Sequence, residues 1–281
     1  MLTHTFQHLP GIGKASDLRL KEAGLRTWDD ALRAARLPLK SSLCPLVAAG
    51  LAESAERLEA GDALWFSERL PAPEQWRLYP HFHARAAYVD IETTGFSWPG
   101  GHITCIALYD GASLKTYVHG RNLEEFADDI LNYDLLVTWN GRAFDAPFLR
   151  RALQIPLRMA HLDLFPVFRS LGIKGGLKKV EKSLGLEREG LDGVDGYMAV
   201  LLWREYERTG AENVLETLLA YNAEDVLSLE YLSRHACALH GAPLEPADSG
   251  GPPKTGGCVN PFRPDAALLQ RLCRYLPSRG Y

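Results

Sequence analysis

Two carboxylates stand close together in an otherwise apolar segment, YVDIETTG, residues 88–95. Side chains alternate between the two faces of an extended strand, so Asp90 and Glu92 would share one face. Val89 and Ile91 would share the other face and could pack into a core. Two like charges this close repel each other, and burying either without a counter-charge is costly. A basic residue brought in by folding, or a divalent cation bound by the hard carboxylate oxygens, would balance them. An edge strand with a solvated polar face is the alternative.

A third acid, Asp145, follows an apolar segment in LLVTWNGRAFDAPFLRR, residues 135–151. Asn140 and Gly141 are typical of a turn after a strand, and Pro147 suits the start of a helix. Asp145 could therefore simply be a residue of the first helical turn, where the helix dipole stabilises a negative charge. The length of the compound pattern N-G-x-x-F-D-x-P-F-L favours a more specific role.

A fourth acid lies in LLAYNAEDVLSLEYL, residues 218–232, where the apolar residues have helical spacing. Tyr221 and Asp225 are four residues apart and would lie on one face of this helix. Such a pair commonly shares only a hydrogen bond. Together with Asp90, Glu92 and Asp145, however, the pair indicates a functional site.

The elements that would position these acids alternate along the middle of the chain. Three successive strands, the last two joined by an Asp110-Gly111 hairpin, are followed by a helix, a buried strand and another helix. This order is that of an α/β fold, an RNase H-like mixed sheet flanked by helices, although several α+β folds also begin with three strands in a meander. The expected strands are 86–92, 102–110, 114–119 and 134–140, and the expected helices are 123–131, 145–153 and most of 162–239.

Composition divides the chain into four parts. Residues 1–70 read as a small all-helical domain, and 71–85 as a Pro-containing linker. Residues 86–240 would form the α/β domain. Residues 241–281 are rich in Pro and Gly, which predicts a flexible tail that ends in a short possible helix.

The overall composition bounds the function. The net charge is −4, so a nucleic-acid partner would be held by a metal and local basic patches rather than by a global field. No apolar run reaches the roughly 20 residues of a membrane span, and the start of the chain lacks a signal-peptide pattern. We therefore expect a cytoplasmic protein with no membrane partner. Five cysteines without a C-x-x-C spacing argue against a disulfide framework and a cysteine zinc site.

The N-terminal segment LPGIGKASDLRLKEAGLRTWDDAL, residues 9–32, resembles a helix-hairpin-helix element. Its turn, Gly11 to Gly13, would present backbone N–H groups to a nucleic-acid phosphate without reading sequence. Only nine residues precede Pro10, which leaves room for at most a short first helix. A purely structural turn is the alternative.

In their order along the chain, DIETTG, NGRAFDAPFL and YNAED resemble the three motifs of the DnaQ-like 3′–5′ exonucleases, in the tyrosine-bearing subgroup called DEDDy. The similarity runs from about residue 86 to 235, and within this superfamily the chain most resembles the bacterial YprB-type RNase H-like family. The histidine-bearing subgroup would have His at position 220, where this chain has Ala220. Tyr221 fits the tyrosine-bearing subgroup.

The resemblance implies a metal-dependent 3′–5′ exonuclease that acts on the 3′ ends of single-stranded DNA or RNA. Asp90, Glu92, Asp145 and Asp225 would bind two divalent cations, Mg²⁺ or Mn²⁺, in a two-metal hydrolysis. Glu92 and Tyr221 would orient the attacking water. Contacts to the terminal nucleotide are implied for Thr93, Thr94, Gly95, Phe96, Asn140 and Phe144.

Some charged residues have two readings. Asp163 could be a fifth site carboxylate, but its position before Leu164 favours an N-cap. The cluster Lys174, Lys178, Lys179 and Lys182 could meet phosphates, although a solvated helix face is favoured.

Two other functions fit the same residues. The chain could be a catalytically inactive nucleic-acid binding module, against which the complete set of acids weighs. It could also be a metal-dependent phosphoesterase of small molecules, in which the Gly11 to Gly13 turn would have no purpose.

Overall fold

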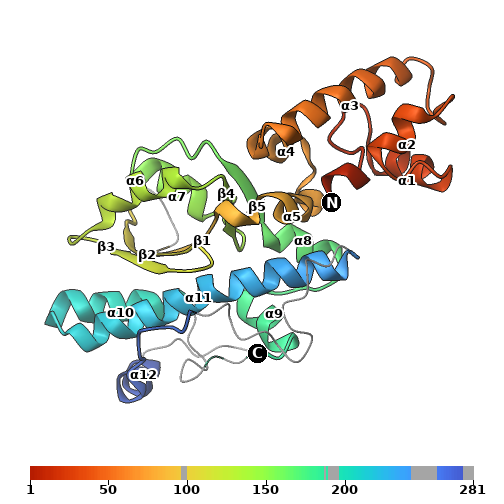
Figure 1. Cartoon of the computed structure of the whole chain (residues 1–281). Coiled ribbons are helices and arrows are strands. Elements are labelled where there is room, and N and C mark those ends of the chain that lie inside the picture. The colour runs from red at the N-terminus through yellow and green to blue at the C-terminus, as the bar shows by residue number, and fades with distance from the viewer. Residues whose placement is uncertain (96–99, 187, 189–195, 242–257, 275–281) are drawn as a thin grey trace.

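A mixed β-sheet lies at the centre of the molecule (Figure 1). The computed structural model describes residues 1–95, 100–186, 188, 196–241 and 258–274. Within these residues the sheet has five strands in the order β3-β2-β1-β4-β5; β1 to β3 are antiparallel neighbours, and β4 and β5 run parallel to β1. The predicted mixed sheet with flanking helices is confirmed. The strands are β1 Ala86–Thr93, β2 Ile103–Tyr109, β3 Leu114–Val118, β4 Leu135–Thr138 and β5 Ala160–Asp163.

Two groups of helices cover the two faces of the sheet, and they lie on opposite sides of it in Figure 1. On one face, Val89 and Ile91 of β1 share an apolar cluster with Phe148 of α7. On the other face, Tyr88 shares a cluster with Val226 of α11. The alternation expected for β1 is therefore present, and Asp90 and Glu92 point towards α11. The covering helices are α6 Phe126–Asp129 and α7 Asp145–Ala152 on the first face, and α10 Gly196–Thr209 and α11 Glu212–Leu239 on the second.

Two details differ from the sequence prediction. The strand β5 was not expected, because its four residues, Ala160–Asp163, are too few to show alternation and the region reads as helical. The helix expected over 123–131 is three short turns, Leu123–Glu125, Phe126–Asp129 and Ile130–Asn132, of which the first and last are 3₁₀. Both differences concern short segments, and the predicted mixed sheet with flanking helices remains.

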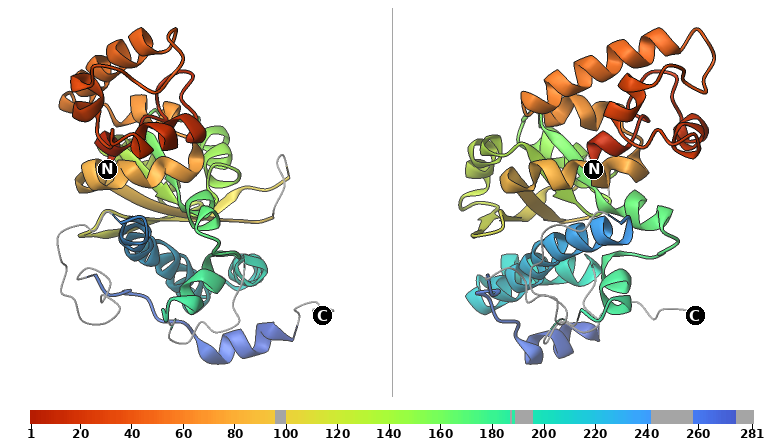
Figure 2. Two further views of the ribbon diagram at one scale, coloured as in Figure 1. Left: turned by 90° about the vertical axis from the view of Figure 1, so that its right-hand side faces the viewer. Right: turned by 45° about the vertical axis from the view of Figure 1, so that its right-hand side comes forward.

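The N-terminal helices form a lobe beside the sheet, visible at the top of both views in Figure 2. They are α1 Lys14–Glu22, α2 Trp28–Arg33, α3 Cys44–Glu59 and α4 Ala63–Arg69. Buried side chains of the lobe, such as Phe6 before α1 and Phe66 in α4, belong to the same apolar cluster as Tyr88 of the sheet. A hydrogen bond also joins the two parts, because the Ser67 hydroxyl accepts from the backbone N–H of His161 at 2.9 Å. The lobe and the sheet therefore share one core.

The segment predicted as a linker is folded. Residues 72–85 form two 3₁₀ helices, Ala72–Leu78 and His83–Arg85, on either side of α5, Tyr79–Phe82. Trp76 and Tyr79 are buried against the common core. This connection packs tightly and fixes the lobe to the sheet.

The Gly11 to Gly13 turn leads directly into α1. Gly11 has a φ of 78°, a left-handed value that glycine adopts without strain. Both glycines are exposed, and Gly13 is the N-cap residue of α1. In the first turn of α1, the Asp17 carboxylate accepts from the Phe6 N–H at 2.7 Å and so fixes the preceding loop. Phosphate binding at this turn stays a prediction.

The C-terminal segment returns to the α11 side of the sheet. The helix α12, Ala266–Cys273, lies where a short helix was expected and buries Leu268 and Leu272 against α10 and α11. Much of the tail that was predicted to be flexible, 242–257 and 275–281, lies outside the described residues. Among the helices that the structure describes, none combines the length and the apolarity needed to cross a membrane.

Candidate active site

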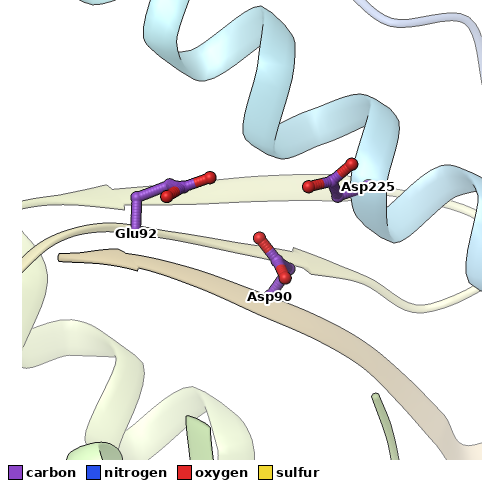
Figure 3. A group of neighbouring side chains, drawn as sticks. All are labelled: Asp90, Glu92 and Asp225. Atoms are coloured by element: carbon purple, nitrogen blue, oxygen red, sulfur yellow. The ribbon is translucent and has the colours of Figure 1, made fainter. Parts of the chain in front are cut away.

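Three carboxylates from two distant segments meet above the centre of the sheet (Figure 3). Asp90 and Glu92 come from β1, and Asp225 comes from α11, which crosses that face. Each of the three offers an oxygen atom, and these oxygens lie within 4.8 Å of one another. The Glu92 and Asp225 side chains are buried, so the negative charges are concentrated where water screens them poorly.

Asp145 lines the same cavity at a different position. It is the first residue of α7, and its Oδ1 accepts a hydrogen bond of 3.2 Å from the backbone N–H of Ile91. This bond ties α7 to the middle of β1. Asp145 does not belong to the group of three acids within 4.8 Å, although it is buried beside them.

The turn before Asp145 explains the pattern of its motif. Asn140 has a φ of 59°, a conformation that Asn tolerates better than most residues. A Cβ on Gly141 would lie 2.3 Å from Thr138 Oγ1, so only glycine fits there. Asp163 accepts from the backbone N–H of Asn140 at 2.8 Å and caps α8, Leu164–Ser170, through the N–H of Phe165 at 3.1 Å. Asp163 is thus the N-cap that its position suggested, and it also holds the turn.

An asparagine positions the first acid. Asn222 Nδ2 donates to Asp90 Oδ2 at 2.8 Å and to the backbone carbonyl oxygen of Asp90 at 3.2 Å. Sequence reasoning missed Asn222. The available signal was its spacing, three residues before Asp225 on the same helical face.

Replacing Asn222 with alanine is expected to weaken Mn²⁺ binding by about 10–100-fold. The substitution keeps the Asp90 carboxylate but removes the hydrogen bonds that orient it. Isothermal titration calorimetry of the full chain measures the change. Asn213→Ala is the matched control, since Asn213 lies on the same helix and donates to Asp265, which does not line the cavity. Equal Kd values for wild type and Asn222→Ala would show that Asp90 does not depend on this amide.

A cavity of about 740 Å³ opens over the acids. Of the residues implied to contact a nucleotide, Thr93, Gly95, Asn140 and Phe144 line it, as do Asp145 and Tyr221. Other lining residues, which the sequence did not indicate, are apolar and include Trp139, Phe165, Leu177 and Val200.

The remaining nucleotide-contact predictions have other outcomes. The structure does not bring Thr94 to the lining, because its hydroxyl accepts from the His102 N–H at 3.0 Å at the start of the hairpin. Phe96 lies outside the described residues. Gly11 and Gly13 lie in the helical lobe and do not line this cavity.

Two basic side chains reach the site. Folding therefore supplies part of the positive charge that Asp90 and Glu92 require. Lys178 Nζ donates to Tyr221 Oη at 2.5 Å and lies 4.0 Å from the centre of the Tyr221 ring. Arg188 forms an ion pair with Asp225. The solvated face predicted for the lysine cluster is wrong for Lys178, while its neighbours Lys174, Lys179 and Lys182 are exposed.

Burial dominates the protonation of the acids. It raises the pKa of Asp90 and of Glu92 well above the ordinary range, and the neighbouring charge of Asp225 adds to both shifts. Burial also raises the pKa of Asp145 to about 7, against the lowering effect of the hydrogen bond from Ile91. The pKa of Tyr221 is raised by burial and then by Asp225, so its phenol stays protonated near neutral pH.

The arrangement fits a divalent cation. Three oxygen donors converge, and Asp225 Oδ1, which forms the ion pair with Arg188, meets no aligned hydrogen-bond donor in the described part of the chain. Hard carboxylate ligands at this density suit a hard divalent cation rather than a softer metal. A doubly charged ion would also relieve the repulsion that raises the pKa of each acid.

Comparison with known proteins assigns the chain to a family. Residues 87–237 match the model of a family in the RNase H superfamily. The uncharacterized protein YprB of Bacillus subtilis (strain 168) is 28% identical over 171 residues, which cover 53% of this chain and 41% of YprB. The chain thus spans about two fifths of the length of that relative. A solved structure, the family B DNA polymerase of the archaeon Pyrobaculum calidifontis, is similar with a TM-score of 0.41 and 17% identity, over 56% of this chain and 26% of the polymerase. Because the family match covers more than half of its 281 residues, the chain belongs to the RNase H superfamily.

Proposed function

We propose that this protein is a metal-dependent nuclease that removes nucleotides from the 3′ ends of single-stranded DNA or RNA. The observation that carries the proposal is the convergence of Asp90, Glu92 and Asp225 within 4.8 Å beneath an open cavity. Membership of the RNase H superfamily supports nucleic-acid hydrolysis with divalent metals. The tyrosine on the same helical face supports the DEDDy type of exonuclease.

The acids would hold the metal. Asp90, Glu92 and Asp225 would form the first ligand group, and Asp145 would complete a second. Two divalent cations, Mg²⁺ or Mn²⁺, would activate the attacking water and stabilise the charge on the leaving 3′ oxygen. The protein's part is to keep these four carboxylates together in a buried site, where their attraction for a cation is weakly screened.

Tyr221 would orient the attacking water. Its phenol keeps its proton because burial and the nearby acids raise its pKa. Lys178 donates to the phenol oxygen, so the phenol hydrogen is directed away from Lys178 and is available to an acceptor in the cavity. The pair fixes the direction in which Tyr221 donates.

The apolar walls would hold the end of the strand. Trp139 and Phe165 line the cavity with ring centres 6.0 Å apart, and Phe144 lines it as well. Aromatic side chains stack on bases of any sequence, which suits an enzyme that removes successive nucleotides. The same walls would exclude bulk water from the reacting phosphate.

The test uses 5′-labelled single strands of DNA and of RNA with Mg²⁺ or Mn²⁺. We expect a ladder that shortens from the 3′ end, is removed by chelation and is absent with Asp90→Ala. Internal cuts would contradict the exonuclease mode, and immediate release of the 5′-labelled nucleotide would contradict the polarity. Binding without cleavage would favour the inactive binding module, and metal-dependent turnover of a small phosphate ester with intact strands would favour the phosphoesterase.

Replacing Tyr221 with phenylalanine is expected to lower kcat by about 10²-fold, because the group that orients the nucleophile is lost. The metal ligands remain, so the Kd for Mn²⁺ should change little. Single-turnover kinetics and calorimetry measure the two quantities. Tyr231→Phe is the control, because Tyr231 lies on the same helix but stacks on His235. A kcat within twofold of wild type would remove Tyr221 from the mechanism.

A further inference from the structure

A buried arginine contacts one of the proposed metal ligands. The Arg188 side chain is 10% exposed and forms ion pairs with both Asp225 and Glu181. Glu181 belongs to α9, Leu177–Ser183, and does not line the cavity. One guanidinium thus joins a structural acid to an acid of the site.

The contact with Glu181 is much better formed than the contact with Asp225. Arg188 Nε donates to Glu181 Oε2 at 2.8 Å and Nη2 donates to Oε1 at 2.7 Å, which is the two-pronged geometry of a strong pair. In contrast, Nη1 approaches Asp225 Oδ1 without the alignment of a hydrogen bond, and both atoms are buried without another partner. Glu181 therefore fixes the guanidinium through two aligned hydrogen bonds, whereas the contact with Asp225 is a close ion pair without that alignment.

We propose that Arg188 is the counter-ion of Asp225 in the metal-free site and competes with a divalent cation for this carboxylate. Arg188 thereby sets the metal concentration at which the site fills. This inference rests on the proposed function, since it concerns the same ligands.

The competition follows from the position of the charges. A doubly charged ion on Asp225 would lie close to the guanidinium in a buried region, where like charges repel strongly. Glu181 holds Arg188 by two hydrogen bonds, which opposes its withdrawal. Metal binding must therefore proceed against a fixed positive charge, at a cost in affinity.

The test is the affinity for Mn²⁺, measured on the full chain by calorimetry and by the shift of the unfolding temperature with Mn²⁺ concentration. Arg188→Gln removes the charge but keeps a hydrogen-bond donor for Glu181. We expect its Kd for Mn²⁺ to fall by about tenfold or more. Arg188→Met, which is neutral and apolar, should act in the same direction, and Arg188→Lys, which keeps the charge, should stay closer to wild type.

Arg208→Gln is the matched control. Arg208 makes the same two-pronged contact with Glu205, at 3.0 and 2.8 Å, but it is exposed near the end of α10. Its substitution should leave the Kd unchanged. This comparison separates the loss of a charge beside Asp225 from the loss of any arginine.

The outcomes distinguish this inference from the proposed function. If wild type binds no Mn²⁺, or binds it equally well with Asp90→Asn, both the metal site and the role of Arg188 are overturned. If wild type binds Mn²⁺ through Asp90 but the folded neutral variants have unchanged or higher Kd values, only the competition is overturned.

Discussion

Asp90→Asn is expected to lose about 10³-fold or more of the nuclease rate. Asp90 lies in the centre of the acid cluster, and each ligand oxygen removed weakens charge stabilisation worth several kcal/mol in the transition state. Asparagine keeps the size of the side chain, so the fold should be retained. The measurement is the rate of shortening of a 5′-labelled strand at saturating Mn²⁺, together with circular dichroism of the variant.

Asp128→Asn is the control for this prediction, since Asp128 is an exposed aspartate on α6. It should keep the wild-type rate. A folded Asp90→Asn protein that retains more than about a tenth of the rate would be incompatible with a metal bound by Asp90 in the reaction.

The second large effect concerns how the free energy of unfolding of the metal-free protein depends on pH. Burial raises the pKa of Asp145 in the folded chain from 3.8 to about 7. An acid with a raised pKa binds its proton more tightly in the folded state, so the fold loses stability as pH rises from about 4 through about 7. Asparagine in its place is neutral at every pH. The free energy of unfolding of Asp145→Asn, relative to that of wild type, should therefore rise by about 2–3 kcal/mol between pH 5 and pH 8.

Urea unfolding of both proteins at several pH values in chelator measures this difference. Comparing the two proteins cancels the buried histidines, such as His8 and His161, whose lowered pKa values act in the opposite direction. Mn²⁺ should reverse the order at pH 8, because the cation stabilises the ionised acid of wild type. A difference that is constant with pH would mean that Asp145 ionises normally in the fold.

Local patterns predicted the strands β1 to β4 and the face of β1 that carries Asp90 and Glu92. The alternation around Asp90 indicated which of its neighbours face the core, and the helical spacing of Tyr221 and Asp225 placed both in one cavity. The Asn140-Gly141 turn was readable because its backbone geometry admits few residue types. These features depend on neighbours in the sequence, and for that reason a single sequence reveals them.

The supports of the site depend on contacts between distant segments. Arg188 reaches Asp225 from beyond α9, and Asn222 reaches Asp90 across the space between α11 and β1. Nothing in the spacing around Arg188 indicates its partner, because an isolated arginine after a helix usually lies in solvent. The short strand β5 was missed for a related reason: its pairing with β4, rather than its own residues, makes it a strand.

The hydrogen bond from His161 to Ser67 has a consequence for self-association. β5 is an outermost strand of the sheet, and the unpaired amides of such a strand invite a strand from another molecule. Here α4 lies against that border, and its serine already occupies the His161 amide. The helical lobe thus covers the β5 edge and hinders its pairing with a strand of another molecule, a role separate from any contact with nucleic acid.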